Sequence, residues 1–539
     1  MVIITDKRIE ELAQINQAQA DEITLLKAKV AWFEEQLVLA KHRQFGTSSE
    51  QTAVGQEALV FNEAEALAVP ELPEPVIETV TYDRRKPVGG RKAQVAGLPV
   101  EEIDYRLPED EQICPQCAGP LHEMGADVRQ EIKIVPATAT LVKHNRIKYA
   151  CRHCQCEETT TPILTAPAPK PAFPNSLASA SAVAHIMTEK FVMASPLYRQ
   201  EKQLERNGIN ICRQTLANWM IKGAEWLDLV YRPLHVDLLT RPVIHADETI
   251  LQVLREPGRA ATADSRMWLY RTGWQEPPDE PDPDQTMIWS RPIVLFEYQQ
   301  TRGSKHPKDF LGDYNGFLNT DAYCGYDPLA IQLTLLGCWA HARRTFVDAI
   351  KVLPPSAQND KNNPSPAHIG LKRCNDLYSI EHGLKDCTAH QRYTARLEKS
   401  KPVLDSFKQW LDEMAGKVIP KSKLGQAIGY CRSQWTKLCA FLLDGRLEID
   451  NNRAERSIKA FVIGRKNFLF ANTPNGAKAS ATIYSIVETA KENGLNPFKY
   501  LEYLFEKLPN IDRDDPAAIA ELFPWAPAVQ DKCGVPARK

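Results

Sequence analysis

Residues 242–249 read PVIHADET, an apolar run that predicts a buried strand and leads to the acidic residue Asp247. Residues 317–326 read FLNTDAYCGY and place Asp321 where a second strand runs into a turn of small residues. Residues 450–456 read DNNRAER and place Glu455 at the start of a helix. Three carboxylates that converge at one sheet edge can hold two divalent ions, which align a nucleophile with a phosphodiester and stabilise the leaving oxygen. The pattern therefore points to the breaking and joining of nucleic-acid strands.

Four strings carry a resemblance to a known family: HADET (245–249), CWAHARR (338–344), DNNRAER (450–456) and GRKNFLF (464–470). In this order they resemble the transposases of the insertion-sequence-66 family, with gaps, from about residue 41 to about residue 527. The resemblance implies a multidomain α+β protein with a retroviral-integrase-like (RNase H-like) mixed α/β core. It further implies an Asp-Asp-Glu triad with two Mg²⁺ or Mn²⁺ ions, cleavage at the ends of the element and strand transfer into target DNA. It also suggests two small accessory proteins from the same element.

Asp247 and Asp321 each have a plain structural alternative. An unpaired buried carboxylate is costly, so Asp247 could instead form a salt bridge with a Lys or Arg. Asp321 could be an ordinary turn residue, with Asp327 as the substitute ligand. Glu248 points to the opposite face of the strand and is the weaker ligand. We favour Asp247 and Asp321 as ligands.

Glu455 has a stronger competitor for its role. Counted from Asn452, it stands where a capping box places a Glu that closes the start of a helix. From the residues alone, the roles of helix cap and metal ligand are equally well supported for Glu455. The resemblance to the family motif favours the role of metal ligand. Glu488, in a predicted helix at 484–492, is the replacement if Glu455 is only a cap.

The string CWAHARR contains Cys338 and His341 in a Cys-x-x-His arrangement that some transposase families carry after the second Asp. It resembles half a metal site, but no partner pair is visible. We therefore predict structural roles, with His341 as a buried hydrogen-bonding residue. Basic residues near the second and third carboxylates could grip the DNA backbone: Arg343, Arg344, Arg456, Lys459, Arg465 and Lys466.

Length and charge set further limits. A chain of 539 residues predicts three or four domains. No apolar run is long enough to span a membrane and the first residues are polar, so we expect a bacterial cytoplasmic, nucleoid-associated protein. Residues 51–113 carry thirteen acidic and six basic residues, so the rest of the chain has a net charge of +5 although the whole has −2. DNA binding must therefore use local basic patches.

Two Cys-x-x-Cys pairs predict a zinc ribbon at residues 111–165. The ligands are Cys114, Cys117, Cys151 and Cys154 for one structural Zn²⁺. Residues 129–135 and 140–149 alternate in polarity like the strands of a hairpin. Possible substitute ligands are Cys156, His122 and His153.

The N-terminal residues 1–50 contain five heptads between positions 6 and 42. Ile9, Ile23 and Val30 share one seam, with Asn16 as a possible register setter. We predict a coiled coil that pairs two protomers; the alternative is an amphipathic helix packed on its own chain. Residues 51–110 read as an acidic Pro-rich linker with a basic arm at 84–92.

Residues 174–235 predict a helix-turn-helix region, with helices at 179–189, 196–206 and from about 212 to 222. Arg213, Gln214 and Asn218 on the third helix suit guanine and adenine edges. The alternative is an ordinary helical hairpin.

The predicted core is divided by an insertion. Residues 241–351 carry strand signals near 242–251, 266–272, 292–299 and 331–337, and one that leads to Asp321. Residues 352–445 read as an all-helical insertion, and 446–509 complete the core. Asn496 and Pro497 predict the start of the last core helix. Residues 510–539 form a tail element that we expect to be loosely ordered.

Two other functions fit parts of this pattern. A non-catalytic DNA-binding regulator would keep only the zinc ribbon and the helix-turn-helix. An RNase H-like nuclease would hydrolyse DNA without joining it. The intact triad argues against the first, and strand-transfer products would exclude the second.

Overall fold

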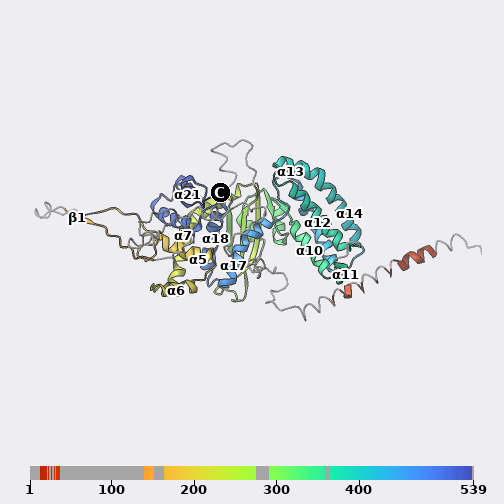
Figure 1. The fold of residues 1–539 in the computed structure, drawn as a ribbon, viewed down its shortest axis with the longest axis horizontal. Helices are drawn as coiled ribbons and strands as arrows, with labels where there is room; N and C mark the ends of the chain where they lie inside the picture. The colour runs from red at the N-terminus through yellow and green to blue at the C-terminus, as the bar shows by residue number, and fades with distance from the viewer. Residues whose placement is uncertain are drawn as a thin grey trace, which may run out of the picture. The chain divides into compact units, whose positions relative to one another are not determined.

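The computed structural model describes residues 139–150, 163–274, 291–358 and 363–536, and parts of 12–36. Its centre is a mixed five-stranded sheet with the strand order β5-β4-β3-β6-β7 (Figure 1). The strands are β3 (Val243–Gln252), β4 (Asp264–Thr272), β5 (Val294–Gln299), β6 (Phe317–Asn319) and β7 (Thr334–Leu336). β3, β4 and β5 pair antiparallel, whereas β6 and β7 run parallel to β3. Each predicted core strand is present, although β6 and β7 are only three residues long.

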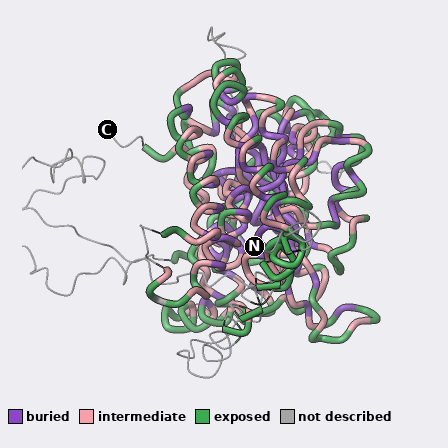
Figure 2. Tube along the Cα trace, turned by 90° about the vertical axis from the view of Figure 1, so that its right-hand side faces the viewer, coloured by how far each residue is buried: buried purple, intermediate pink, exposed green. Residues whose placement is uncertain are grey.

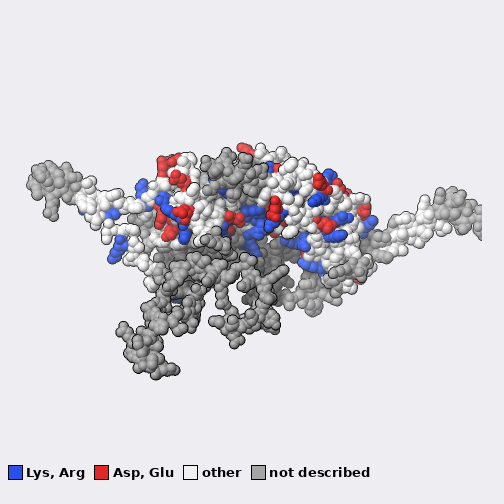
Figure 3. All heavy atoms as spheres, turned by 45° about the horizontal axis from the view of Figure 1, so that its top comes forward, with Lys and Arg blue, Asp and Glu red and all other residues white. Residues whose placement is uncertain are grey.

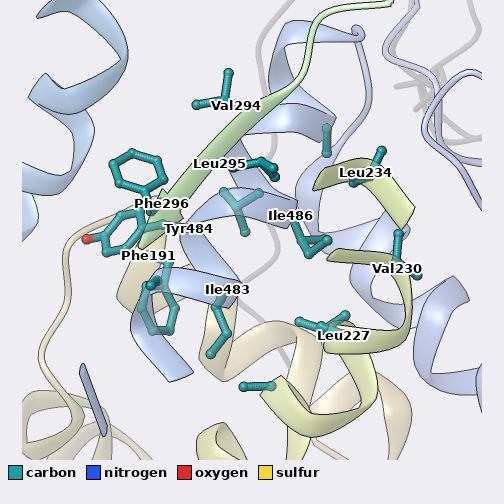
Figure 4. Close-up of a cluster of buried hydrophobic side chains, with 14 of the residues drawn as sticks. Phe191, Leu227, Val230, Leu234, Val294, Leu295, Phe296, Ile483, Tyr484 and Ile486 are labelled. Atoms are coloured by element: carbon teal, nitrogen blue, oxygen red, sulfur yellow. The ribbon is translucent and has the colours of Figure 1, made fainter. Parts of the chain in front are cut away.

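Helices from distant parts of the chain cover one side of this sheet. α18 (Pro474–Glu492) packs against β5 and against α7 (Arg213–Leu239). Figure 4 shows apolar side chains of α5 (Ala180–Phe191), α7, β5 and α18 meeting in one cluster. Within it, Tyr484 packs edge to face on Phe191 at a centroid distance of 4.9 Å. The core of this side therefore depends on segments separated by more than 200 positions.

Two buried hydroxyls fasten α18 to the sheet. Thr489 Oγ1 donates to the Val294 carbonyl at 2.9 Å and accepts from its N–H at 3.0 Å. Ser485 Oγ accepts from the Phe296 N–H at 2.7 Å. These bonds satisfy backbone groups on the outer edge of β5, the outermost strand, which would otherwise be buried without partners.

The helical insertion has a core of its own. Its longer helices are α12 (Pro366–Gly383), α14 (Lys401–Ala415) and α15 (Lys423–Ser433). They pack with α10 (Trp339–Lys351) around Trp339, Phe346 and Phe407. α11 (Pro355–Gln358), α13 (Ala389–Ala395) and α16 (Trp435–Cys439) are shorter, and no strand occurs in the described part of residues 352–445. The prediction of a helical insertion between the second and third carboxylates is consistent with this arrangement.

A buried arginine ties the insertion to the chain that re-enters the core. Arg396 has no exposed surface and pairs with Glu381 at 2.7 Å. Its guanidinium also donates to the carbonyls of Phe441, Asp444 and Leu447 at 2.8–3.0 Å. A buried charge persists only when it is paired and hydrogen-bonded, and every contact of Arg396 meets this need.

The predicted helix-turn-helix region forms three helices. They are α5 (Ala180–Phe191), α6 (Leu197–Arg206) and α7. Ser179 caps α5 by accepting from the Ala182 N–H at 3.0 Å, and the turn after α6 uses Gly208 at φ +79°. α7 is much longer than the predicted helix from 212 to 222, because its apolar face continues through Leu234 and Leu238 against α18.

The C-terminal region differs from the prediction of loose order. Asn496 caps α19 (Pro497–Lys507) as predicted, by accepting from the Lys499 N–H at 3.2 Å. Beyond it, α20 (Pro516–Ala520) and α21 (Pro527–Cys533) are ordered helices. The tail belongs to the core because its sparse apolar residues are buried there: Ile519, Leu522, Trp525, Val529 and Cys533.

The structure describes two further segments, 139–169 in part and 12–36 in part. β1 (Lys148–Ala150) pairs antiparallel with β2 (Ile163–Thr165). The strand predicted at 140–149 is therefore present only at its end, and its partner follows the second cysteine pair. The predicted strand at 129–135 lies outside the described residues. In the described part of 12–36 the chain is helical.

Figure 2 shows buried residues gathered in the interior of the molecule and exposed residues around it.

Among the described residues, no helix has the length and apolarity needed to cross a lipid bilayer.

Glu297 generates a prediction about pH. Its Oε2 is buried without a hydrogen-bond partner, and burial raises the pKa of Glu297 to about 7 despite a hydrogen bond from Gln299. Because the folded pKa exceeds the unfolded value of about 4.3, wild-type stability falls as pH rises through this window. Glu297→Gln should therefore equal wild type near pH 4 and gain about 1–3 kcal/mol at pH 8, measured by urea unfolding.

Glu398→Gln, at an exposed position of the insertion, is the matched control and should show no such pH-dependent gain. Equal behaviour of the two variants between pH 4 and pH 8 would show that Glu297 is solvated.

Candidate active site

Asp247 lies on β3, and Asp321 follows the end of the neighbouring strand β6. In the parallel pairing of β3 with β6, His245 is the register partner of Asn319. Asp247 and Asp321 each follow two positions later along adjacent chains. Neighbouring strands are about 4.8 Å apart, so the pairing places these side chains close together.

Local backbone contacts orient both aspartates. Asp247 Oδ1 accepts from the Glu248 N–H at 2.8 Å, and Asp321 Oδ1 accepts from the Tyr323 N–H at 2.9 Å. The turn after Asp321 holds Ala322 at φ +69°, a left-handed conformation that non-glycine residues adopt infrequently. Such local strain persists only where surrounding contacts determine the conformation.

The third carboxylate is supplied by α17 (Asn452–Phe468). The N-cap is Asn451, whose carbonyl accepts from the Glu455 N–H at 3.1 Å, and no side chain caps the helix. The capping box that would start at Asn452 is therefore not formed, because the helix begins one residue earlier than that box requires. The Glu455 carboxylate turns instead toward His341, with Oε1 3.6 Å from Nδ1.

Electrostatics link the three acidic groups. Burial raises the pKa of Asp247 well above its usual range, and the nearby charges of Glu248, Asp321 and Glu455 raise it further. The hydrogen bond from the Glu248 N–H opposes this shift without cancelling it. Like charges gathered in a partly buried place are unfavourable without a counter-charge, so the arrangement suits a bound cation.

A histidine two residues before Asp247 joins the sheet to the start of α17. His245 is fully buried, and its Nδ1 lies 3.0 Å from Asn451 Oδ1. Asn451 Nδ2 donates to the Ala246 carbonyl at 2.9 Å, which directs Oδ1 toward the ring. His245 Nε2 lies 2.9 Å from Glu448 Oε2. The ring therefore contacts Asn451 through Nδ1 and Glu448 through Nε2.

Two arginines extend this network. Arg453 grips the Glu448 carboxylate with Nε and Nη2 at 2.8 and 2.9 Å. Burial alone would raise the pKa of Glu448, but the hydrogen bonds from His245 and Arg453 hold that pKa well below its usual range. Arg271 on β4, also buried, donates to the Arg453 carbonyl at 3.3 Å and pairs with Glu492 at 3.0 Å. α17 is therefore fixed to two strands and to α18.

Glu248 performs a different task on the other side of β3. Its carboxylate pairs with Arg302 at 2.5 Å and accepts from the Tyr326 hydroxyl at 2.9 Å. The Arg302 guanidinium stacks on the Tyr323 ring at 3.6 Å from its centroid. These contacts hold the loop that follows Asp321, consistent with the expectation that Glu248 is the weaker ligand.

The two substitute carboxylates are engaged elsewhere. Glu488 forms an ion pair with Lys491 at 2.8 Å, one turn along α18. Asp327 pairs with Lys437 of the insertion at 2.5 Å. Neither contributes to the raised pKa of Asp247, whereas Glu455 does.

Cys338 and His341 lie beside the third carboxylate. Cys338 is the N-cap residue of α10, and its buried Sγ accepts from the Asn451 N–H at 3.2 Å. His341 is only partly buried and faces Glu455 rather than the protein core. The sequence predicted a buried hydrogen-bonding residue here, whereas the His341 side chain is 28% exposed and its Nδ1 has no hydrogen-bond partner.

Sequence comparisons match these segments to one family. Residues 175–479 match the sequence model described as "Transposase IS66 family". This match covers more than half of the chain and includes all three carboxylates. The chain belongs to the IS66 transposase family.

Other IS66 models match further segments of the chain. They are the zinc-finger binding domain (111–155), the IS66 C-terminal element (485–525) and "Transposase C of IS166 homeodomain" (32–103). Two similar proteins come from Sinorhizobium fredii. The uncharacterized protein y4jD is 31% identical over 79% of this chain and 81% of its own length. The uncharacterized protein y4qI is 29% identical over 94% of this chain and 92% of its own length.

In this IS66 transposase the proposed base-reading residues are accessible. Arg213, Gln214 and Asn218 are exposed on the first turns of α7. Leu216 and Trp219, between and beside them in sequence, are buried on the other face. An exposed polar face over a fixed apolar face is what a DNA-reading helix requires.

The basic residues near the carboxylates have different surroundings. Arg456 is exposed on α17, and Arg343 donates to Asn375 Oδ1 at 2.7 Å. Arg465 donates to the Ile250 carbonyl and to Thr249 Oγ1, so its guanidinium is occupied by β3. Interactions also engage Arg344, Lys459 and Lys466. Figure 3 shows Lys and Arg side chains gathered near the middle of the drawn face, beside acidic ones.

The four predicted zinc ligands, Cys114, Cys117, Cys151 and Cys154, lie outside the described residues. The zinc-finger match nevertheless spans all four of them. Their spacing and this match together indicate a zinc-binding segment.

The contacts of Asn451 generate a stability prediction. Asn451→Ala should lower the free energy of unfolding by about 2–6 kcal/mol, because the buried His245 Nδ1 and Ala246 carbonyl each lose a hydrogen-bond partner at roughly 1–3 kcal/mol. Urea unfolding followed by tryptophan fluorescence would measure the change. The control is Asn467→Ala, an exposed asparagine in the same helix. A loss no larger than that of the control would contradict the assignment.

Proposed function

We propose that this IS66 protein is a DDE transposase that cleaves DNA at the ends of its element and joins the freed ends to target DNA. Asp247, Asp321 and Glu455 form the catalytic triad. The observation that carries the proposal is that the charges of Asp321 and Glu455 both act on Asp247, although consecutive members of the triad are 74 and 134 positions apart in sequence.

The strand arrangement supports an RNase H-like core. An antiparallel set, β5-β4-β3, continues into two parallel strands, β6 and β7, in one mixed sheet. In such a sheet the ends of parallel neighbours meet at one edge, where functional groups from separate segments can assemble. The proposed triad takes two members from this edge and the third from a helix packed along β3.

The triad has the chemistry of a site for two Mg²⁺ or Mn²⁺ ions. Carboxylate oxygens are the protein ligands that these hard ions prefer, and the pKa of Asp247 is raised first by burial and then by the neighbouring negative charges. When bound, such ions activate the attacking oxygen and stabilise the leaving oxygen of a phosphodiester. The chain itself contributes position: the Glu248 and Tyr323 N–H groups orient the aspartates, and the His245–Asn451 contact sets the start of α17.

The remaining segments would bring DNA and a second protomer to this site. α6 and α7 would read the element ends, and the cysteine segment would bind one Zn²⁺. Exposed seam residues of the N-terminal helix, including Leu12, Ile23 and Val30, support self-association into a dimer. The protein would act on nucleoid DNA in the bacterial cytoplasm, with small accessory proteins of the element as possible partners.

Loss of charge at the first two carboxylates tests the proposal. Asp247→Asn and Asp321→Asn should each reduce cleavage and joining of element-end DNA by more than about 100-fold. Loss of a residue that only hydrogen-bonds a metal ligand costs about 10–100-fold, so a larger loss indicates a ligand. Binding to the same DNA should change little, because the proposed base contacts come from α7 and the proposed backbone contacts from basic side chains, not from these aspartates. Gel assays of cleavage, strand transfer and binding would measure all three. Activity close to wild type in either variant would refute its role.

Glu455→Gln tests the third position separately. Because no capping box forms, glutamine should leave the melting temperature nearly unchanged while most strand transfer is lost. Retained strand transfer would redirect the search to Glu488. Wild-type protein that binds but never cuts would instead be a regulator, and cleavage without joined products would indicate a nuclease.

Recognition is tested on the exposed face of α7. Arg213→Ala or Asn218→Ala should weaken binding to element ends by about 1–3 kcal/mol per lost base contact, and less on random DNA. Arg432→Ala, an exposed arginine of the insertion, is the matched control. Equal losses on both DNAs would reduce α7 to a backbone-contacting role.

A further inference from the structure

Three side chains of different chemistry meet at the junction of α10 and α17. Cys338 begins α10, His341 lies one turn later, and Glu455 comes from the first turns of α17. The sulfur, one ring nitrogen and one carboxylate oxygen lie within 4.8 Å of one another. Sequence spacing had suggested only half a metal site here, and the fold supplies the missing third group.

Two of these atoms lack hydrogen bonds although solvent cannot reach them. His341 Nδ1 and Glu455 Oε1 are both buried and without hydrogen-bond partners. The 3.6 Å between them exceeds the usual hydrogen-bond range. Ligands of a tetrahedral ion, at about 2.0–2.3 Å from the metal, are separated by roughly 3.3–3.8 Å. The two atoms therefore have the separation of ligands to a shared ion rather than of a donor and acceptor.

The ligand types select the ion. A thiolate and an imidazole favour Zn²⁺ and related ions over Mg²⁺, which prefers oxygen ligands. Thiolate and carboxylate together carry two negative charges, which balance a divalent ion in a partly buried place. Burial raises the pKa of the Cys338 thiol to about 12, so ion binding would release a proton. The Asn451 N–H, 3.2 Å from the sulfur, would then hydrogen-bond the thiolate.

We propose that Cys338, His341 and Glu455 form a binding site for one Zn²⁺ ion, separate from both the predicted zinc ribbon and the Asp247–Asp321 edge. Three protein ligands leave a fourth position for water. Because Glu455 is shared, Zn²⁺ here withdraws the third carboxylate from the two aspartates. Occupancy therefore inhibits strand transfer. The proposal of a binding site depends only on the three side chains. The proposal of inhibition also depends on the proposed function.

Co²⁺ is the probe for binding, because a cobalt–thiolate bond gives a charge-transfer absorption band. Full-length protein purified with its ribbon zinc is titrated with Co²⁺. Wild type should show one thiolate-bound equivalent more than Cys338→Ser, and His341→Gln should bind this equivalent at least about 10-fold more weakly. Cys431→Ser, a buried cysteine of the insertion, should match wild type. Identical spectra for wild type and Cys338→Ser would overturn the site, as would unchanged affinity in a folded His341→Gln.

The inhibitory consequence is measured separately in strand transfer with Mg²⁺. Added Zn²⁺ should inhibit wild type, and His341→Gln should need at least about 10-fold more Zn²⁺ for half-inhibition relative to its own zinc-free rate. Equal sensitivity would overturn the inhibitory role while leaving the cobalt result intact. Failure of the proposed function is distinguishable, because Asp247→Asn would then retain strand transfer whatever the zinc titration shows.

Discussion

The buried contact between His245 and the Glu448–Asn451 segment determines the geometry of the candidate active site. A polar ring removed from water is costly without polar partners, and here the imidazole meets Glu448 on one side and Asn451 on the other. His245 lies on the strand that carries Asp247, while Asn451 is the N-cap of the helix that carries Glu455. The His245 side chain thus positions Asp247 and Glu455 relative to each other, although the two residues are far apart in the sequence.

The same segment is held from the insertion side. Arg396 and Arg392 both donate to the carbonyl of Leu447, the residue before Glu448. Tyr378 of α12 donates to the Asp450 carboxylate at 3.0 Å. The insertion is therefore more than a spacer between the second and third carboxylates, because its buried polar groups fix the approach of the chain to the start of α17. Removing it would leave that approach without its polar partners.

The sequence predicted the parts that depend on local periodicity and capping. The strands around Asp247, the helix after Trp339 and the cap at Asn496 follow from patterns within ten or so residues. The predictions of the length of α7 and of a loosely ordered tail were wrong because both features depend on distant partners. α7 continues along α18, and Trp525 and Val529 of the tail are buried in the core. A capping box at Asn452 was excluded only by the observed N-cap. The roles of His245 and Arg302 could not be read from sequence, since their partners lie 206 and 54 positions away.

The packing of α18 against both α7 and β5 has a consequence for how this protein is made. Contacts between residues 213–239 and 474–492 give the main unit a high contact order, which slows folding because a long loop must close first. During synthesis the apolar faces of α7 and β5 stay uncovered until α18 leaves the ribosome, some 240 residues after α7. A chain terminated within the insertion would present both faces to solvent and would lack α17. Incomplete copies of the gene would thus yield aggregation-prone, inactive protein rather than a functional fragment.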